Sequence, residues 1–134
     1  MKRIEFGELK IGDTAKKYIQ HCLDTDWISM GPKTELLEKK FAEIMGTKYA
    51  VATSSGTSSL VAVTLALDEL CPRKVVRGKS NIICPALGFI ANSTAIVSGR
   101  LKPNWVDVKP DTLNMNEDLV EEAIDEDTVA IYAI

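Results

Sequence analysis

The first third of the chain carries apolar residues at helical spacing. Within residues 12–23, Ala15, Tyr18, Ile19 and Leu23 form one apolar stripe, which predicts a first helix. A second helix is predicted to begin at Pro32, whose missing N–H suits a first helical turn, and to end at Gly46, which suits a left-handed cap. The polar segment 24–32 between them predicts a loop. We therefore expect residues 1–46 to form an N-terminal helical segment.

From residue 49 onward, short apolar runs alternate with longer segments. The runs, which predict strands, are residues 49–52, 82–84, 105–108 and 129–134. The longer segments, which predict helices, are residues 57–70, 89–98 and 116–124. Strands with little polar alternation, joined by helices, are typical of a parallel sheet covered on both faces. The expected fold class is α/β, with residues 47–134 forming a β-α-β-α-β-α-β arrangement around a mainly parallel sheet.

Composition narrows the class of protein. The 134 residues are 46% hydrophobic and 26% charged, as in an ordinary soluble domain. A net charge of −3 offers no basic surface for a polyanion, so nucleic-acid binding is not expected. Residues 1–10 lack the apolar core of a signal peptide, and no apolar stretch is long enough to cross a bilayer. We expect a cytoplasmic protein with no membrane partner.

The cysteines and the single histidine do not form a metal motif. Cys22, Cys71 and Cys84 are far apart and include no C-x-x-C pair, so reduced thiols are expected. His21 precedes Cys22 directly, and neighbouring positions on a helix point in different directions. No metal site is predicted.

A hydroxyl-rich junction follows the first predicted strand. Residues 53–59 read Thr-Ser-Ser-Gly-Thr-Ser-Ser and lead into a helix that is almost without charge. Such a junction gathers unpaired N–H groups and the positive end of the helix dipole at the edge of a parallel sheet, which favours a phosphate ligand. The chain contains neither G-x-x-x-x-G-K-[ST] nor G-x-G-x-x-G. The alternative is that these hydroxyls only cap the helix.

Phe89 follows the next predicted strand and would lie at the same sheet edge as Thr57. A phenyl ring at that place can stack on a flat heteroaromatic cofactor, or it can simply belong to the core. Asp107 and Asp111 could suggest a carboxylate pair, but Pro110 lies between them in a sequence typical of a turn. We assign no catalytic role to either aspartate, and the acidic residues of 121–127 are interpreted as a solvated helix end.

Taken in series, several segments resemble the nucleotide-sugar aminotransferase family, a branch of the fold-type I pyridoxal-phosphate enzymes. The segments are residues 27–32 (WISMGP), 37–42 (LEKKFA), 46–51 (GTKYAV), 54–57 (SSGT) and 106–114 (VDVKPDTLN). The resemblance implies that residues 47–134 are the first part of the cofactor domain. It also implies that Gly56, Thr57 and Ser58 hold the phosphate of pyridoxal 5'-phosphate, and that Phe89 stacks on its pyridine ring.

The resemblance further implies an activity and its partners. The leading expectation is amino transfer from an amino-acid donor to a nucleotide-linked keto-sugar by a homodimer. A close alternative is the 3-dehydrase of the same family, which uses pyridoxamine phosphate. Gly88 before Phe89 and the lengthened link of residues 71–80 favour that alternative. An alternative of another class is a non-catalytic α/β module that binds a phosphate ligand.

The final predicted strand is apolar up to Ile134, with no turn or polar tail after it. A strand this apolar should be covered by further elements. We therefore expect a truncated N-terminal part of the enzyme. The family's aspartate under the pyridine nitrogen and its Schiff-base lysine, or the histidine that replaces it, have no match in this chain. No catalytic residue is predicted, and the chain by itself is expected to be inactive.

Overall fold

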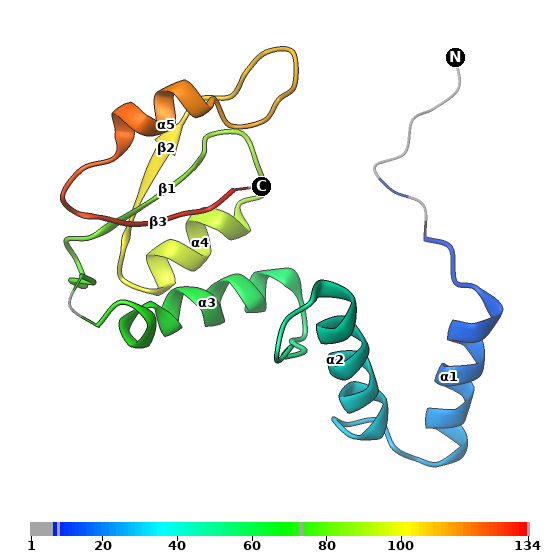
Figure 1. The fold of residues 1–134 in the computed structure, drawn as a ribbon. Coiled ribbons are helices and arrows are strands. Elements are labelled where there is room, and N and C mark those ends of the chain that lie inside the picture. The colour runs from blue at the N-terminus through cyan, green and yellow to red at the C-terminus, as the bar shows by residue number, and fades with distance from the viewer. Residues whose placement is uncertain (1–6, 8, 73, 134) are drawn as a thin grey trace. The chain divides into compact units, whose positions relative to one another are not determined.

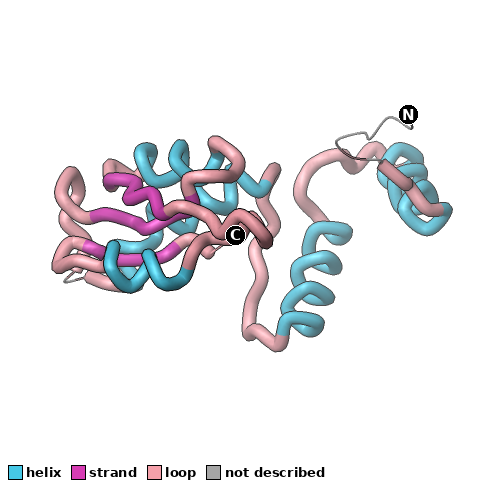
Figure 2. The backbone as a smooth tube through the Cα atoms, turned by 90° about the horizontal axis from the view of Figure 1, so that it is seen from above, coloured by secondary structure: helices cyan, strands magenta, loops and turns pink. Residues whose placement is uncertain are grey.

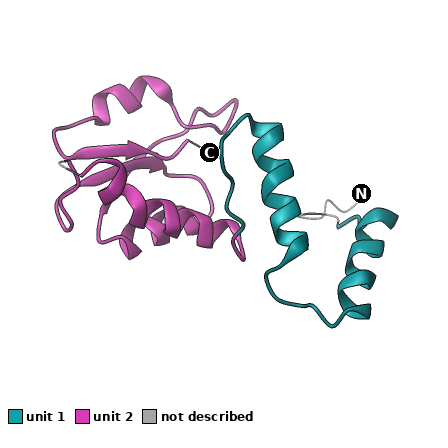
Figure 3. Cartoon of the chain, turned by 60° about the horizontal axis from the view of Figure 1, so that its bottom comes forward, with its two compact units in different colours: residues 1–52 teal, residues 53–134 magenta. Residues whose placement is uncertain are grey.

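A computed structural model describes residues 7, 9–72 and 74–133. Most of the start of the chain, for which the sequence predicts no leader, and Ile134 of the final predicted strand lie outside the described residues. The chain divides into two compact units, residues 1–52 and 53–134 (Figure 3). Each unit is described on its own.

The first unit contains two helices. Helix α1 is Asp13–Asp24 and helix α2 is Pro32–Met45, each within one residue of its predicted limits. Gly46 adopts φ 66 and its N–H donates to the carbonyls of the last helical turn, as expected of a left-handed cap. Pro32 and Gly46 were therefore enough to predict both ends of α2.

The predicted strand over residues 49–52 is wrong, since the structure assigns no strand there. A strand needs a neighbour to complete its ladder of hydrogen bonds, and no described strand pairs with this segment. Its backbone groups form hydrogen bonds to side chains of the first unit instead. The N–H of Ala52 donates to Glu38 Oε1 at 2.8 Å, and the carbonyl of Tyr49 accepts from Thr47 Oγ1 at 3.0 Å.

The second unit is an α/β arrangement (Figure 1). Its elements in chain order are α3 (Gly56–Leu70), β1 (Asn81–Pro85), α4 (Ala91–Ser98), β2 (Lys102–Val106), α5 (Glu117–Ala123) and β3 (Thr128–Ile131). The strands are parallel and lie in the order β2-β1-β3, with a register shift between β1 and β3 at Asn81. The predicted fold class, an α/β domain with a parallel sheet, is confirmed.

Strand β1 lies at the centre of this unit. All five of its residues are buried, and Ile82, Ile83 and Cys84 have no exposed surface. Helices α3 and α4 cover one face of the sheet and α5 covers the other, which gives three layers (Figure 2). Burial raises the pKa of the Cys84 thiol, because the charged thiolate would be desolvated there. Cys84 is therefore a core residue of the sheet.

Strand β2 begins and ends earlier than its apolar residues suggest. Residues 105–108 were predicted, whereas the strand is Lys102–Val106. The first residues of β2 pair with β1 from Asn81 onward, although Lys102 and Asn104 are polar. Because β2 lies at the edge of the described sheet, fewer of its side chains have to be buried. Val108 has already left the sheet and forms an isolated antiparallel bridge with Met115.

A hydrogen-bonded cluster closes the edge of the sheet where the strands begin. The Oδ1 atom of Asp125 accepts hydrogen bonds from Asn81 Nδ2 at 2.8 Å, Thr128 Oγ1 at 2.9 Å and the N–H of Asp127 at 2.9 Å. The bond from Asn81, followed by that from Thr128, lowers the pKa of Asp125 below its ordinary value. The carboxylate thus joins the first residue of β1 to the first residue of β3.

Because the folded-state pKa of Asp125 is lowered, its contribution to stability is present above the unfolded-state pKa and is lost as the pH falls through the folded-state value. We therefore expect Asp125→Ala to lower the urea midpoint of unfolding at about pH 7 and to lower it less at about pH 3. Glu122→Ala, on the exposed surface of α5, is the control and should match the wild type at both pH values. An equal loss at both pH values for Asp125→Ala would contradict this account.

Candidate functional site

The start of α3 is built by a serine cap. Ser55 has an extended backbone, φ −165 and ψ 163, and its side-chain oxygen accepts a hydrogen bond from the N–H of Ser58 at 3.2 Å. Its carbonyl accepts from the N–H of Ser59 at 3.1 Å. The chain therefore turns sharply into the helix at Gly56 and leaves the N–H groups of the first turn pointing away from the helix body.

Two of those N–H groups are open. Within the part of the chain that the structure describes, the backbone N–H groups of Gly56 and Thr57 donate no hydrogen bond. The first turn also contains no acidic residue. Helix α5 differs, because Glu117 and Asp118 already balance its dipole. The start of α3 therefore offers two free donors and an uncompensated positive end to an anion.

The hydroxyl groups at this turn are partly engaged with one another. Ser58 Oγ lies 3.0 Å from Ser54 Oγ and 3.1 Å from Ser55 Oγ, and Thr53 Oγ1 lies 2.6 Å from Ser59 Oγ. The same turn thus caps the helix and leaves donors available to an anion. Of the three residues predicted to hold a phosphate, Gly56 and Thr57 present free N–H groups, whereas the N–H of Ser58 is bonded to the cap.

Phe89 lies in the turn between β1 and α4, and its carbonyl accepts from the N–H of Asn92 at 3.1 Å. The helix begins at Ala91, two residues later than predicted, because Gly88 and Phe89 form the turn that leads into it. The Phe89 side chain is 71% exposed. It is therefore not a core residue of the described second unit, and its ring is free to contact a ligand.

The start of α3 and the loop that carries Phe89 lie on the side where the strands of the sheet end (Figure 1). The loop after β1 leads to α4 on one face of the sheet, and the loop after the adjacent β2 leads to α5 on the other. Ligands of open α/β sheets bind at such a reversal, outside the carboxyl ends of the strands.

These residues fit the phosphate and one ring face of pyridoxal phosphate. A Cβ atom added at Gly56 would meet no atom of the rest of the chain within 4 Å, so the space beside this residue is open. Phe89, in the loop that follows β1, has an exposed ring that offers a flat apolar surface. The sequence prediction and the geometry therefore point to one edge of the second unit.

The carboxylates and thiols supply no second site. Asp107 accepts a hydrogen bond from the N–H of Val108 at 2.8 Å, and Asp111 accepts from the N–H of Thr112 at 2.9 Å, as in turns. Among the described residues, no cluster of three or more His, Cys, Asp or Glu side chains could hold a metal ion. No helix in the described ranges is long and apolar enough to cross a membrane.

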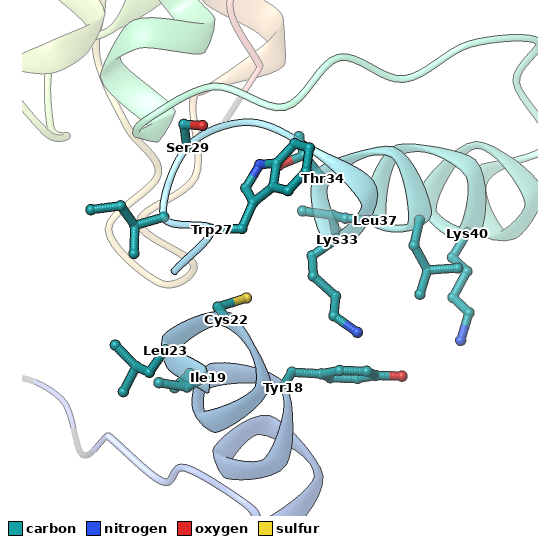
Figure 4. A pocket seen from close by; sticks show the side chains of 12 residues that line it. Tyr18, Ile19, Cys22, Leu23, Trp27, Ser29, Lys33, Thr34, Leu37 and Lys40 are labelled. Atoms are coloured by element: carbon teal, nitrogen blue, oxygen red, sulfur yellow. The ribbon is translucent and has the colours of Figure 1, made fainter. Parts of the chain in front are cut away.

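The first unit contains an apolar cavity of about 570 Å³ between α1 and α2 (Figure 4). Ile19 and Leu23 of α1 face Leu37 of α2 across it. The ammonium group of Lys33 lies 4.5 Å from the centre of the Tyr18 ring. Apolar side chains form most of the lining, so the cavity mainly offers packing surface.

One link near the candidate site was not predicted from the sequence. Thr64, in the middle of α3, has no exposed surface, and its hydroxyl is hydrogen-bonded to the hydroxyl of Tyr132. In the sequence both residues read as ordinary members of apolar segments. Sixty-eight positions separate them, and no local pattern marks such a pair.

Comparison with known proteins identifies related chains. The sequence pattern of the DegT/DnrJ/EryC1/StrS aminotransferase family matches residues 9–134. An uncharacterized protein of Methanocaldococcus jannaschii is 34% identical over 124 residues, which cover 92% of this chain and 30% of that protein. The family resemblance predicted from the sequence is confirmed.

Two solved structures resemble the chain closely. GDP-4-keto-6-deoxy-D-mannose-3-dehydratase of E. coli, solved with bound hydrated PLP, is 29% identical with a TM-score of 0.85, covering 98% of this chain and 33% of that one. Helicobacter pylori PseC, an aminotransferase involved in pseudoaminic acid biosynthesis, is 25% identical with a TM-score of 0.81, covering 98% and 34%. The chain thus spans about a third of the length of these relatives.

Proposed function

The chain belongs to the DegT/DnrJ/EryC1/StrS aminotransferase family, and from that premise we propose that it is the part of a nucleotide-sugar aminotransferase that holds the cofactor phosphate. The cofactor of this family is pyridoxal 5'-phosphate. The observation that carries the proposal is the start of α3, where two N–H groups are free and no acid balances the helix dipole.

Each predicted residue has a role in this proposal. The N–H groups of Gly56 and Thr57 donate to phosphate oxygens, while the hydroxyl groups of Thr57 and Ser58 can add further donors. Phe89 lies against one face of the pyridine ring, where it excludes water and fixes the tilt of the ring. Residues 53–134 thereby bind and orient the cofactor.

The proposed reaction is amino transfer from an amino acid to a keto-sugar that is carried on a nucleotide. Pyridoxal phosphate supplies an aldehyde that accepts the amino group and a ring that stabilises negative charge on the substrate carbon. The residues of this chain contribute binding and orientation. Gly56, Thr57, Ser58 and Phe89 have no proposed role in proton transfer.

Dehydration at C3 of the sugar is a second candidate. It is favoured by the close structural likeness to the E. coli 3-dehydratase and by Gly88 before Phe89. A Cβ atom at position 88 would lie 3.1 Å from Asn92 Nδ2, so the turn that presents Phe89 accepts glycine more readily than a larger residue.

A product analysis tests the proposed function. The full-length protein is supplied with pyridoxal phosphate, L-glutamate and a nucleotide-linked 4-keto-sugar, and the products are examined by mass spectrometry. Aminotransferase activity yields an amino sugar with one 2-oxoglutarate for each sugar converted. Dehydratase activity yields a keto-sugar that lacks its 3-hydroxyl group. Neither product, with cofactor bound, would contradict both proposals.

We further propose that the complete protein is a homodimer. Helix α3 leaves Val63, Leu65 and Leu70 at least half exposed, although α4 and the sheet already cover its other side. Such an apolar surface is typical of subunit contacts. We expect light scattering to give twice the subunit mass, and Leu65→Glu to shift the protein towards the monomer. An active monomer at high concentration would refute the dimer.

A further inference from the structure

Tyr132 follows β3 directly and reaches the helix that begins at the candidate phosphate site. The residue is 8% exposed. Its hydroxyl group is hydrogen-bonded to Thr64 Oγ1 and lies 3.3 Å from the carbonyl oxygen of Leu60. Leu60 lies one helical turn after Gly56. A residue of the sheet therefore contacts α3 close to the turn that would hold the phosphate.

The three oxygen atoms form a closed network, and the two residues that supply its hydroxyl groups, Thr64 and Tyr132, are buried. Thr64 Oγ1 lies 2.8 Å from the Leu60 carbonyl oxygen, so each hydroxyl group is within reach of the other and of that carbonyl. If Tyr132 donates to Thr64, then Thr64 donates to Leu60, and the reverse order is equally complete. Both hydroxyl protons are used in either case, and a fully satisfied buried network is rigid.

Tyr132 is also bound to the centre of the sheet. Its backbone N–H donates to the carbonyl of Ile83 at 2.8 Å. Ile83 belongs to β1, the strand that leads into the loop of Phe89. One residue therefore connects the first turns of α3 to the strand that presents the stacking ring.

The other half of α3 is held by a different residue. Arg77 Nη2 donates to Asp68 Oδ2 at 2.6 Å, while Nη1 donates to the carbonyl of Gly99 at the end of α4. Among the described residues, the strands and the residues next to them hydrogen-bond α3 only through Tyr132. Arg77 also reaches the carbonyls of Thr64 and Leu65, at 3.3 to 3.5 Å. Without the Tyr132 hydroxyl, α3 would therefore stay hydrogen-bonded from Thr64 onward, while residues 56–60 would lose their hydrogen-bonded link to the sheet.

We infer that Tyr132, acting through Thr64, is a positioning residue that sets the distance between the start of α3 and the loop of Phe89. The inference rests on the proposed function, because the distance matters only if both ends contact one cofactor. Phosphate oxygens accept the Gly56 and Thr57 N–H groups only within a narrow range of distance and angle, so a small shift of the helix weakens binding.

The test uses two variants and two matched controls in the full-length protein. Tyr132→Phe removes one hydroxyl group and keeps the ring, and Thr64→Val removes the other. Ser80→Ala is the first control, because it removes a buried hydroxyl group, bonded to Val76 and Lys74, at the opposite edge of the sheet. Tyr49→Phe is the second control, because that ring is 74% exposed.

Three quantities are measured for each variant. They are the dissociation constant for pyridoxal phosphate, the ³¹P chemical shift of the bound cofactor, and the deuterium uptake of peptides that cover residues 53–64 without ligand. We expect Tyr132→Phe and Thr64→Val to raise the dissociation constant about fivefold, as for one weakened hydrogen bond, and to move the ³¹P shift. Deuterium uptake over residues 53–64 should rise in both.

The controls separate positioning from stability. Ser80→Ala should lower the melting temperature about as much as Tyr132→Phe while leaving the dissociation constant and the ³¹P shift unchanged. Wild-type cofactor binding in both Tyr132→Phe and Thr64→Val would overturn the inference. If Tyr132→Phe does not fold, Thr64→Val decides the question alone, and Thr64→Ser should restore binding.

The two proposals can fail separately. If the wild-type protein binds no pyridoxal phosphate, the proposed function fails, and the positional role of Tyr132 is decided by deuterium uptake over residues 53–64. Unchanged uptake in both variants would then overturn that role as well.

Discussion

Replacing Gly56 by valine is expected to weaken pyridoxal phosphate binding about a hundredfold. Gly56 is the first residue of α3, and a Cβ atom there would meet no protein atom within 4 Å. A valine side chain would therefore fit without displacing other parts of the chain, and its methyl groups would crowd a phosphate that approaches the neighbouring N–H groups. Two charge-assisted hydrogen bonds of about 1.5 kcal/mol each would be lost, and about 1.4 kcal/mol corresponds to a tenfold change.

The dissociation constant is measured by fluorescence titration with pyridoxal phosphate, and the fold is monitored by thermal unfolding. Gly12→Val is the matched control, because Gly12 precedes α1 and is equally free of neighbours within 4 Å. The control should bind the cofactor as the wild type does. An unchanged dissociation constant for Gly56→Val would remove the start of α3 from the cofactor site.

Replacing Phe89 by alanine is expected to weaken cofactor binding about tenfold while leaving the melting temperature nearly unchanged. The side chain is 71% exposed, so few protein contacts are lost. A stacked ring contributes about 1 kcal/mol beyond the apolar area that it buries, and the sum is close to a tenfold change. Phe89→Tyr and Phe89→Trp should bind almost normally, because both keep an aromatic face.

Ile90→Ala is the matched control for Phe89. Ile90 is the next residue in the same turn and is 75% exposed, so its loss removes a similar apolar side chain without an aromatic face. We expect normal cofactor affinity in this variant. Equal weakening by both substitutions would show that the turn, rather than the ring of Phe89, affects binding. A large fall in melting temperature for Phe89→Ala would instead indicate a structural role.

Much of the fold could be read from local chemistry. Pro32 and Gly46 mark the ends of α2, and Asn116 caps α5 by accepting a hydrogen bond from the N–H of Asp118. These signals act within one helical turn, so the sequence alone contains them. The predicted strand over residues 49–52 failed for the opposite reason, because strand formation depends on a partner elsewhere in the chain.

The candidate site was predictable only in part. The free N–H groups of Gly56 and Thr57 follow from a helix start with a serine cap, which is a local pattern. The bond from the N–H of Ser58 to Ser55 Oγ agrees with the alternative that these hydroxyl groups cap the helix, but which of the serines acts as the cap depends on rotamers and was not predicted. The same holds for the contacts of Arg77, whose side chain reaches a carbonyl 22 positions away.

The strand order β2-β1-β3 affects how the chain can fold while it is being synthesised. Synthesis proceeds from the N-terminus, so Ile82, Ile83 and Cys84 leave the ribosome well before Thr128–Ile131, the strand that completes their pairing. At ordinary rates of translation the interval is on the order of seconds. During that time β1, whose central residues are fully buried in the finished fold, has one open edge, and an open edge of this kind can pair with the wrong strand.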